Sequence, residues 1–378
     1  GEAGVAFVRR LERWSGDVRG EGRQRFALAP PLRPRVEVGD DDFVVSFDVE
    51  PDAGAGGPHR AGPSATDVVS AWRDGATTVP LPDGGWSPLP TDWLSRFGHQ
   101  VADLLAAREA SGRLPPAVLP DLARLCEALD QPAPPSFGRL RALAGDFDGL
   151  PAVEPPEGLG RGLRSYQTRG LDWLSFLRDT DMGALLADDM GLGKTVQALA
   201  ALRGRTLVVA PTSVLANWLS EVARFRPSLT TSLYHGRDRA LDPGADLTVT
   251  SYALLRLDRD VLTAVDWDTV VLDESQAIKN PESQVARAAF ELRAAFRIAM
   301  TGTPVENRLD ELWSQFHFLN RGLLGGLGDF QARYALPIAD GDVEAAARLR
   351  ARIRPFVLRR LKSEVAPELP PRTEVVLH

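Results

Sequence analysis

The chain has 378 residues, of which 44% are hydrophobic and 25% are charged. This composition is typical of a folded protein with two or three domains, and it excludes disorder of the whole chain. No apolar run approaches the ~18 residues of a membrane-spanning helix, so we expect no membrane association. The formal net charge of −7 argues against a general polyanion-binding protein.

Residues 1–155 are predicted to form a small α+β domain without a reactive cluster. Apolar periodicity predicts three helices, and β-branched or alternating runs predict two strands. Thr91 or Asp92 is the expected N-cap of the second helix. The helices are expected at 7–14, 91–110 and 117–130, and the strands at 36–38 and 41–50.

Three isolated side chains in this part are expected to have structural roles. Cys126 is the only cysteine, which leaves neither an intrachain disulfide nor a cysteine-based zinc site. Its apolar context, LARLCEAL, predicts a buried and unreactive thiol. His59 and His99 have no reactive neighbour in the sequence, so we expect structural or solvent-exposed positions for them.

A loop-rich stretch at 145–162 separates this part from a differently organised one, and we place the boundary between residues 155 and 156. Beyond it, apolar strands alternate with helices, which predicts a parallel α/β sheet built by right-handed crossovers. The strands are expected at 184–188, 206–210, 247–251, 269–273 and 297–300, and the helices at 194–203, 212–224, 281–295 and 308–319.

The segment LLADDMGLGKTVQALA, residues 185–200, has the order of a phosphate-binding loop: a strand, glycines, then Lys194-Thr195 opening a helix. Glycines let backbone N–H groups approach phosphate oxygens, and a helix N-terminus favours an anion. Lys194 is expected to reach the phosphates and Thr195 to bind Mg²⁺. Asp188 departs from the strict pattern, which has glycine there. The predicted nucleotide-binding residues are Asp189, Met190, Gly191, Leu192, Gly193, Lys194 and Thr195.

A second signal, TVVLDESQ, ends an apolar strand with Asp273 and Glu274. Ligands of open parallel sheets bind at the carboxyl ends of the strands. We therefore expect Asp273 to hold Mg²⁺ and Glu274 to polarise the water that attacks the γ-phosphate. Taken alone, this pair also fits a plain strand end.

Two weaker signals are Gln167 in LRSYQTRGLDWL and the turn Thr301–Thr303 in IAMTGTPVEN. A side-chain amide offers a donor and an acceptor to adenine, and a hydroxyl-rich turn can sense a phosphate. Each also has an ordinary interpretation, as a surface glutamine on a helix and as a simple turn.

Six segments in this order resemble the Swi/Snf-type ATPases of helicase superfamily two: LRSYQTRGLDWL, LADDMGLGKT, VVAPTSVLANWLSE, VTSY, VLDESQAIKNP and MTGTPVENRLDELWS. The resemblance implies that residues 156–363 form a first RecA-like lobe that binds ATP and Mg²⁺. It implies that residues 1–155 are the accessory domain that precedes the motor in some bacterial relatives.

The resemblance also assigns roles to individual residues. Gln167 reads adenine, and Lys194, Asp273 and Glu274 carry hydrolysis. Small hydroxyls suit contacts with a nucleic-acid backbone without sequence readout. The implied DNA contacts are Pro211, Thr212, Thr250 and Ser251, and the residues implied to couple nucleotide state to DNA grip are Gln276, Thr301, Gly302 and Thr303.

The segment RPFVLRRLKSEV, 354–365, resembles the brace that crosses between the two lobes of these ATPases, so residues 364–378 are expected to begin a linker to a second lobe. The arginine-rich stretch 348–362 has seven basic residues and no acidic one, and we favour a brace over a DNA-binding patch there. The second lobe of this family supplies an arginine finger. We therefore expect a fragment that binds ATP-Mg²⁺ but is nearly inactive alone.

The predicted function is that of a bacterial ATP-dependent translocase or helicase-like remodelling ATPase acting on double-stranded DNA. The alternatives are an RNA-polymerase-recycling ATPase and a non-enzymatic, nucleotide-gated scaffold. We expect a cytoplasmic, nucleoid-associated monomer whose N-terminal domain can recruit a protein partner.

Overall fold

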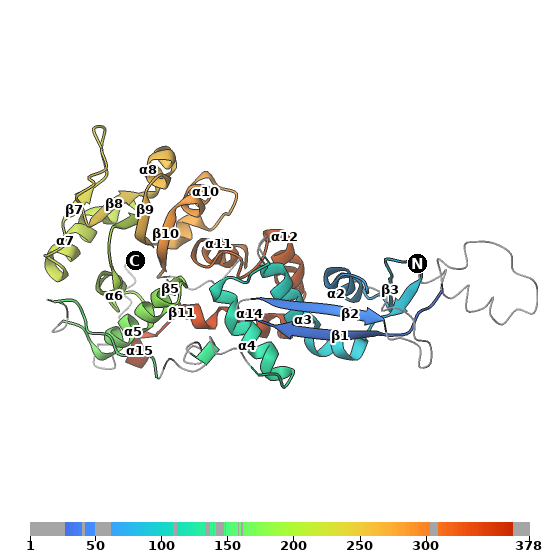
Figure 1. Cartoon of the computed structure of the whole chain (residues 1–378). Helices are drawn as coiled ribbons and strands as arrows, with labels where there is room; N and C mark the ends of the chain where they lie inside the picture. The colour runs from blue at the N-terminus through green and yellow to red at the C-terminus, as the bar shows by residue number, and fades with distance from the viewer. Residues whose placement is uncertain are drawn as a thin grey trace, which may run out of the picture. The chain divides into compact units, whose positions relative to one another are not determined.

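The computed structural model describes residues 27–39, 42–49, 62–108, 112–132, 137–138, 140, 147, 149–157, 159, 162–302 and 309–365. The chain forms two compact units, residues 1–139 and 140–378 (Figure 1). The domain boundary that we place between residues 155 and 156 remains a prediction. Among the described residues, no helix is long and apolar enough to cross a membrane.

The first unit has the predicted α+β character. Strands β1 (Leu32–Val38) and β2 (Phe43–Val49) pair antiparallel, and a short hairpin joins β3 (Thr78–Pro80) to β4 (Trp86–Pro88). Every second residue of β2 is buried, as expected of a sheet covered on one face. The helical elements are α2 (Ala65–Arg73), α3 (Thr91–Ala107), η2 (Pro116–Val118) and α4 (Leu119–Ala128).

The predicted cap of α3 is wrong. Pro90 occupies the N-cap position without a side-chain hydrogen bond, and its carbonyl accepts from the Leu94 N–H at 2.9 Å. Thr91 is thereby already the first helical residue, and Asp92 lies in the first turn, where its charge favours the helix dipole.

The remaining predictions for this unit concern its cysteine, its histidines and its first helix. Cys126 is a free, fully buried thiol on α4, as predicted. His99 on α3 contacts the Trp72 ring edge-on at 4.9 Å, and Gly98 leaves room for that ring because a Cβ there would lie 2.7 Å from it. His99 is exposed and packs on Trp72, in keeping with the expected structural or solvent-exposed position. His59 and the helix predicted at 7–14 lie outside the described residues.

The second unit contains a seven-stranded sheet in which every pairing is parallel, which confirms the predicted fold class. Its strands, in sheet order, are β11 (Val357–Leu358), β5 (Ala184–Leu186), β10 (Arg293–Met300), β9 (Asp266–Leu272), β6 (Thr206–Ala210), β8 (Leu247–Ser251) and β7 (Thr231–Leu233).

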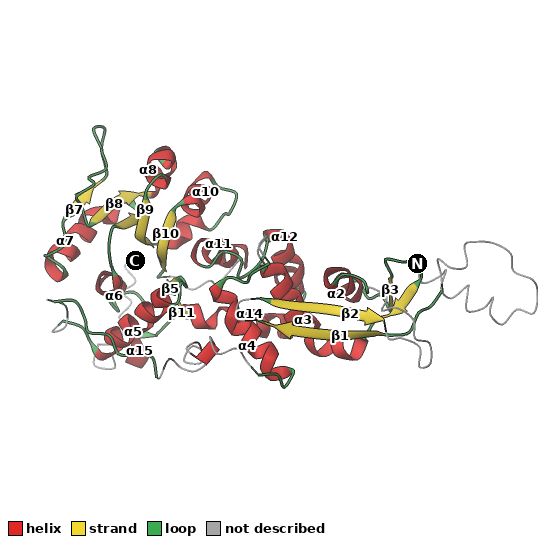
Figure 2. Ribbon diagram, viewed as in Figure 1, coloured by secondary structure: helices red, strands yellow, loops and turns green. Residues whose placement is uncertain are grey.

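Helices cover both faces of this sheet, with α5, α6 and α7 along one side and α8, α10 and α11 along the other (Figure 2). Every residue of β6 and β8 is consequently buried. The helices that flank the sheet are α5 (Ser165–Asp179), α6 (Lys194–Ala201), α7 (Leu215–Phe225), α8 (Tyr252–Leu257), α9 (Arg259–Thr263), α10 (Gln284–Glu291) and α11 (Leu309–Leu319).

Short helical elements complete the unit. They are η4 (Thr212–Val214), η5 (Ser275–Ile278), α12 (Leu327–Phe330), the π-helical turn η6 (Gln331–Ala335), α13 (Leu336–Ala339), α14 (Val343–Ile353), η7 (Arg354–Phe356) and α15 (Lys362–Val365).

Several predicted helices extend a few residues too far, and the largest difference is in α10. The helix expected at 281–295 ends at Glu291, and Arg293 instead begins β10 opposite Asp266 of β9. The sequence RAAF suits either conformation, and pairing with β9 holds it as a strand; the Arg293 side chain also donates to the carbonyls of Thr263 and Ala264.

A half-buried histidine on α11 is expected to make the stability of this unit sensitive to acid. His317 stacks on Trp313 at 4.5 Å and meets the Phe290 ring edge-on at 4.7 Å. Burial, with a smaller effect from the charge of Arg321, lowers the pKa of His317 from 6.5 to about 4. Between these values the unfolded chain binds a proton that the folded chain does not, so stability falls as the pH is lowered.

We therefore expect the melting temperature to drop between pH 6.5 and pH 4, with His317 contributing at most about 3 kcal/mol of that loss. Thermal unfolding of the wild type and His317→Gln across this range measures the effect. If the melting temperature of His317→Gln depended on pH as strongly as that of the wild type, other groups would control the acid sensitivity.

Candidate functional site

The phosphate loop lies between β5 and α6 and has the predicted strand-loop-helix order. Gly191 and Gly193 have φ values of 86° and 75°, a left-handed conformation that favours glycine. Gly193 also caps α6, and a Cβ there would lie 2.5 Å from the Gln167 side chain. The backbone conformation thus favours glycine at both positions, and at Gly193 the absence of a Cβ also leaves room for the Gln167 amide.

Lys194, the first residue of α6, folds back over the loop. Its ammonium donates to the carbonyl of Asp188 at 2.7 Å and to that of Asp189 at 3.5 Å. Burial lowers the pKa of Lys194, while the carboxylates of Asp188, Glu274, Asp273 and Asp189 act in the opposite direction. The carboxylates favour the charged form of Lys194, and an ammonium beside the free N–H groups of a helix N-terminus is suited to bind phosphate.

Asp273 follows β9 and is held from three sides. The Trp218 indole N–H donates to its carboxylate at 2.8 Å, the Tyr252 hydroxyl donates to its carbonyl at 2.8 Å, and its own N–H donates to the Val209 carbonyl. Burial raises the pKa of Asp273, although the Trp218 donor opposes that shift. Burial also raises the pKa of Tyr252, which keeps this hydroxyl protonated as a donor.

Glu274 has a left-handed backbone, with φ 51° and ψ 56°, which is strained for a residue with a side chain. Its carboxylate accepts from the Gln276 amide at 2.7 Å, and the Gln276 oxygen accepts from the Thr301 hydroxyl at 3.3 Å. A hydrogen-bonded chain therefore joins Glu274 to the end of β10, where the sequence predicts coupling residues.

Gly302 lies against the phosphate loop. A Cβ at this position would be 3.1 Å from the Met190 side chain and 3.9 Å from the Lys194 ammonium. Met190 itself is 72% exposed. Thr303 lies outside the described residues. The structure thus brings together the loop, the carboxylate pair and Thr301-Gly302.

Gln167 lies on α5 beside the phosphate loop. Its amide donates to the Leu192 carbonyl at 3.0 Å and accepts from the Arg164 N–H at 2.9 Å, and the Tyr166 hydroxyl also donates to Leu192. These contacts support the loop from behind. The adenine contact of Gln167 remains a prediction.

The four residues predicted to contact DNA follow β6 and end β8, and their side chains differ in exposure. Thr212 is exposed and Pro211 half-buried. Thr250 is fully buried with its hydroxyl on the Tyr234 carbonyl, and Ser251 caps α8 by accepting from the Leu254 N–H. Their DNA contacts remain predictions.

Sequence reasoning missed two aromatic side chains in the same segments. Trp218 lies on α7 just after Thr212, and Tyr252 directly follows Ser251. Trp218 donates a hydrogen bond to the Asp273 carboxylate, and Tyr252 donates one to the Asp273 backbone carbonyl. Each segment predicted to contact DNA is therefore hydrogen-bonded directly to a member of the carboxylate pair. The places of the two aromatic residues inside two of the segments that carry the family resemblance, VVAPTSVLANWLSE and VTSY, were the available signal.

The donor oxygens needed for a Mg²⁺ ion that also takes ligands from a nucleotide are present in these segments. Among the described residues, no group of three or more His, Cys, Asp or Glu side chains is arranged to hold a metal. Mg²⁺ is usually bound through one or two protein oxygens together with substrate phosphates. Thr195, half-buried in the first turn of α6, and Asp273 provide such oxygens.

The family model described as SNF2-related domain matches residues 166–378, more than half of the chain. The chain belongs to this family. It is 46% identical over 231 residues to the putative ATP-dependent helicase/translocase YwqA of Bacillus subtilis, covering 56% of this chain and 25% of that protein. It is 35% identical over 244 residues to a human SWI/SNF-related regulator of chromatin, subfamily A member 1, covering 60% and 23%.

Among solved structures, this chain is similar to the Sulfolobus solfataricus SWI2/SNF2 ATPase core in complex with dsDNA. That structure is 42% identical with a TM-score of 0.54, and the match covers 57% of this chain and 47% of that one. The same core domain solved separately gives 40% identity, a TM-score of 0.55 and coverages of 60% and 49%. The predicted family and RecA-like fold are confirmed. The chain spans about a quarter of these curated relatives and about half of the solved cores.

Proposed function

We propose that this chain is the nucleotide-binding part of an ATP-dependent double-stranded DNA translocase. The observation that carries the proposal is the position of Asp273. Asp273, one member of the proposed hydrolytic pair, accepts a hydrogen bond from Trp218 at its carboxylate and one from Tyr252 at its backbone carbonyl, and these two aromatic residues belong to the two segments predicted to contact DNA. A single residue thereby connects hydrolysis with the DNA track.

The chemistry follows from the positions of the side chains. Lys194 exchanges its carbonyl contacts for phosphate oxygens, and the N–H groups at the start of α6 bind the same anion. Thr195 and Asp273 would hold Mg²⁺, which would supply charge neutralisation at the phosphates when bound. Glu274 accepts a proton from the attacking water, and Gln276 orients its carboxylate.

Double-stranded DNA is the proposed track. The Sulfolobus core with 42% identity is described in complex with dsDNA. The negative charge of this chain predicts weak DNA binding by the chain alone, with a shallow salt dependence, because few phosphates are neutralised. The proposed location of the protein is the cytoplasm, in association with the nucleoid.

The chain alone is proposed to bind ATP-Mg²⁺ and to hydrolyse it poorly. The match covers only about half of the solved SWI2/SNF2 core. An arginine finger contributes about 10³–10⁵ in rate in related NTPases, and in this family it comes from the second lobe. The remainder of the core is also needed to complete the DNA track.

ATP turnover with and without duplex DNA tests this proposal, comparing this chain with a protein extended through the second lobe. We expect turnover to appear in the extended protein, to rise with duplex DNA, and to exceed that of the chain alone by about 10³-fold or more. An extended protein that binds ATP but is indifferent to DNA would move the function to a protein-directed switch.

A further inference from the structure

The phosphate loop contains a buried acid where the strict sequence pattern has glycine. The Asp188 side chain is completely buried. An ionised carboxylate in such a place is costly unless it is paired and hydrogen-bonded. Its partners therefore help to determine the conformation of the loop.

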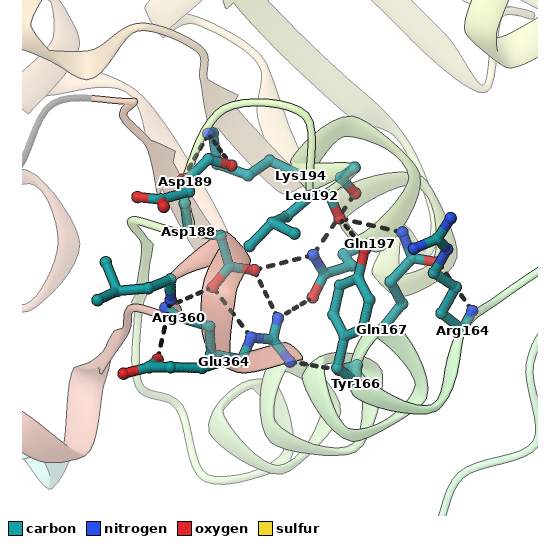
Figure 3. A network of polar contacts seen from close by, with 12 residues as sticks. Arg164, Tyr166, Gln167, Asp188, Asp189, Leu192, Lys194, Gln197, Arg360 and Glu364 are labelled. Atoms are coloured by element: carbon teal, nitrogen blue, oxygen red, sulfur yellow. Dashed lines mark hydrogen bonds and ion pairs between the residues drawn. The ribbon is translucent and has the colours of Figure 1, made fainter. Parts of the chain in front are cut away.

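Arg360 satisfies this carboxylate from 172 positions away in the sequence (Figure 3). Its backbone N–H and its Nε–H both lie 3.0 Å from Asp188 Oδ1, and its Nη2 lies 2.5 Å from Oδ2. A guanidinium fork of this kind fixes both position and orientation of a carboxylate, which a lysine cannot do.

The same guanidinium reaches the two helices that flank the loop. Its Nη2 donates to the Gln197 amide oxygen on α6 at 2.6 Å, and its Nη1 donates to the Tyr166 carbonyl on α5. Gln197 in turn donates to Asp188 at 3.1 Å. Gly170 leaves room for this arrangement, because a Cβ there would lie 2.0 Å from the Gln197 oxygen.

The backbone around Arg360 runs along the loop as well. Strand β11 pairs with β5, and the pairing continues when Ala187 donates to the Leu358 carbonyl at 2.8 Å and Asp189 to the Arg360 carbonyl at 3.1 Å. The Lys362 N–H then donates to the Asp189 carboxylate at 3.0 Å. The segment 357–362 and the first half of the phosphate loop therefore form one hydrogen-bonded unit.

This unit also fixes the resting place of Lys194, whose ammonium donates to the carbonyl of Asp188. We propose that Arg360 is a positioning residue for ATP: by holding Asp188 and Gln197, it sets the geometry in which the loop and Lys194 receive the phosphates. This inference rests on the proposed nucleotide binding, and it makes ATP affinity depend on the segment 357–362, outside the phosphate loop itself.

Calorimetric titration of this chain with ATP and Mg²⁺ tests the proposal. We expect Arg360→Ala to weaken ATP binding about 10- to 100-fold, because small misplacements of positioning groups have effects of that size. Arg359→Ala is the matched control, since the neighbouring arginine is exposed, and it should bind ATP as the wild type does. Arg360→Lys, which retains the charge without the fork, should fall between the two and serves if Arg360→Ala does not fold.

A double variant separates positioning by the ion pair from a general loss of structure. In an Asp188→Asn background, Arg360→Ala should weaken binding less than in the wild type, because no buried carboxylate is left unpaired. Equal losses in both backgrounds, or a folded Arg360→Ala with wild-type affinity, would overturn the role of Arg360.

Lys194→Ala distinguishes this failure from that of the proposed function. If the wild type binds ATP and Lys194→Ala does not, then the ATP affinity of Arg360→Ala tests only the positioning role of Arg360. If the wild type does not bind ATP, or Lys194→Ala binds it equally well, the proposed nucleotide site and the positioning role fall together.

Discussion

Replacing Lys194 with alanine is expected to weaken ATP binding by about 10²-fold or more and to remove turnover in the extended protein. The ammonium is half-buried at the start of α6 and lies among four acidic residues that favour its charged form. Its removal leaves the loop with backbone donors but no cation for the phosphates. The loss should appear both in calorimetric titration of this chain and in the ATPase rate of the extended protein.

Lys279 offers a matched control for this variant. It is exposed after η5, and its removal changes the net charge of the protein by the same amount. Lys279→Ala should therefore retain wild-type ATP affinity. Equal weakening by the two variants would indicate a general electrostatic effect, and no weakening by Lys194→Ala would remove the phosphate loop from the proposed mechanism.

The elements that the sequence predicted best are those whose signals are local. Strands β6 and β8 were predicted with the observed bounds, because TLVVA and LTVTS are short apolar runs buried on both faces. The glycines of the phosphate loop were also predictable from the sequence, because the loop needs a left-handed backbone at these positions and few other residues adopt it.

The elements that were missed depend on distant parts of the chain. Strands β7 and β11 have only three and two residues, and neighbouring strands define them more than their own sequence does. The end of the helix predicted at 281–295 was set by pairing of Arg293 with β9, which periodicity does not show.

The candidate site shows the same division between local and distant signals. Asp188 was visible in the sequence only as a departure from a motif, and its explanation lies in Arg360, 172 residues away. Seven basic residues between 348 and 362 drew attention to that segment without distinguishing its members. One neighbour, Arg359, is exposed, while the Arg360 side chain is 13% exposed and paired with Asp188. Burial, which separates the two arginines, comes from the sheet and is not readable from the run itself.

Replacing Glu274 with glutamine is expected to preserve ATP binding and to reduce hydrolysis by about 10²- to 10⁴-fold. Glutamine keeps the length and shape of the side chain, and its oxygen can still accept from the Gln276 amide. It has no carboxylate to take a proton from water. The left-handed backbone of Glu274 is unchanged by this substitution, so the strain at this residue remains the same.

Turnover of the extended protein on duplex DNA, measured beside ATP affinity, separates this effect from that of Lys194→Ala. Lys194→Ala should lose binding and turnover together, whereas Glu274→Gln should lose turnover alone, because its carboxylate acts on the water and not on the bound phosphates. Glu282→Gln, at an exposed position after the same strand, is the matched control and should hydrolyse ATP normally. If Glu274→Gln kept more than about a tenth of wild-type turnover, a general-base role would contribute too little to account for the expected rate. The chain from Gln276 to Thr301 would then serve to report nucleotide state rather than to orient the catalytic base.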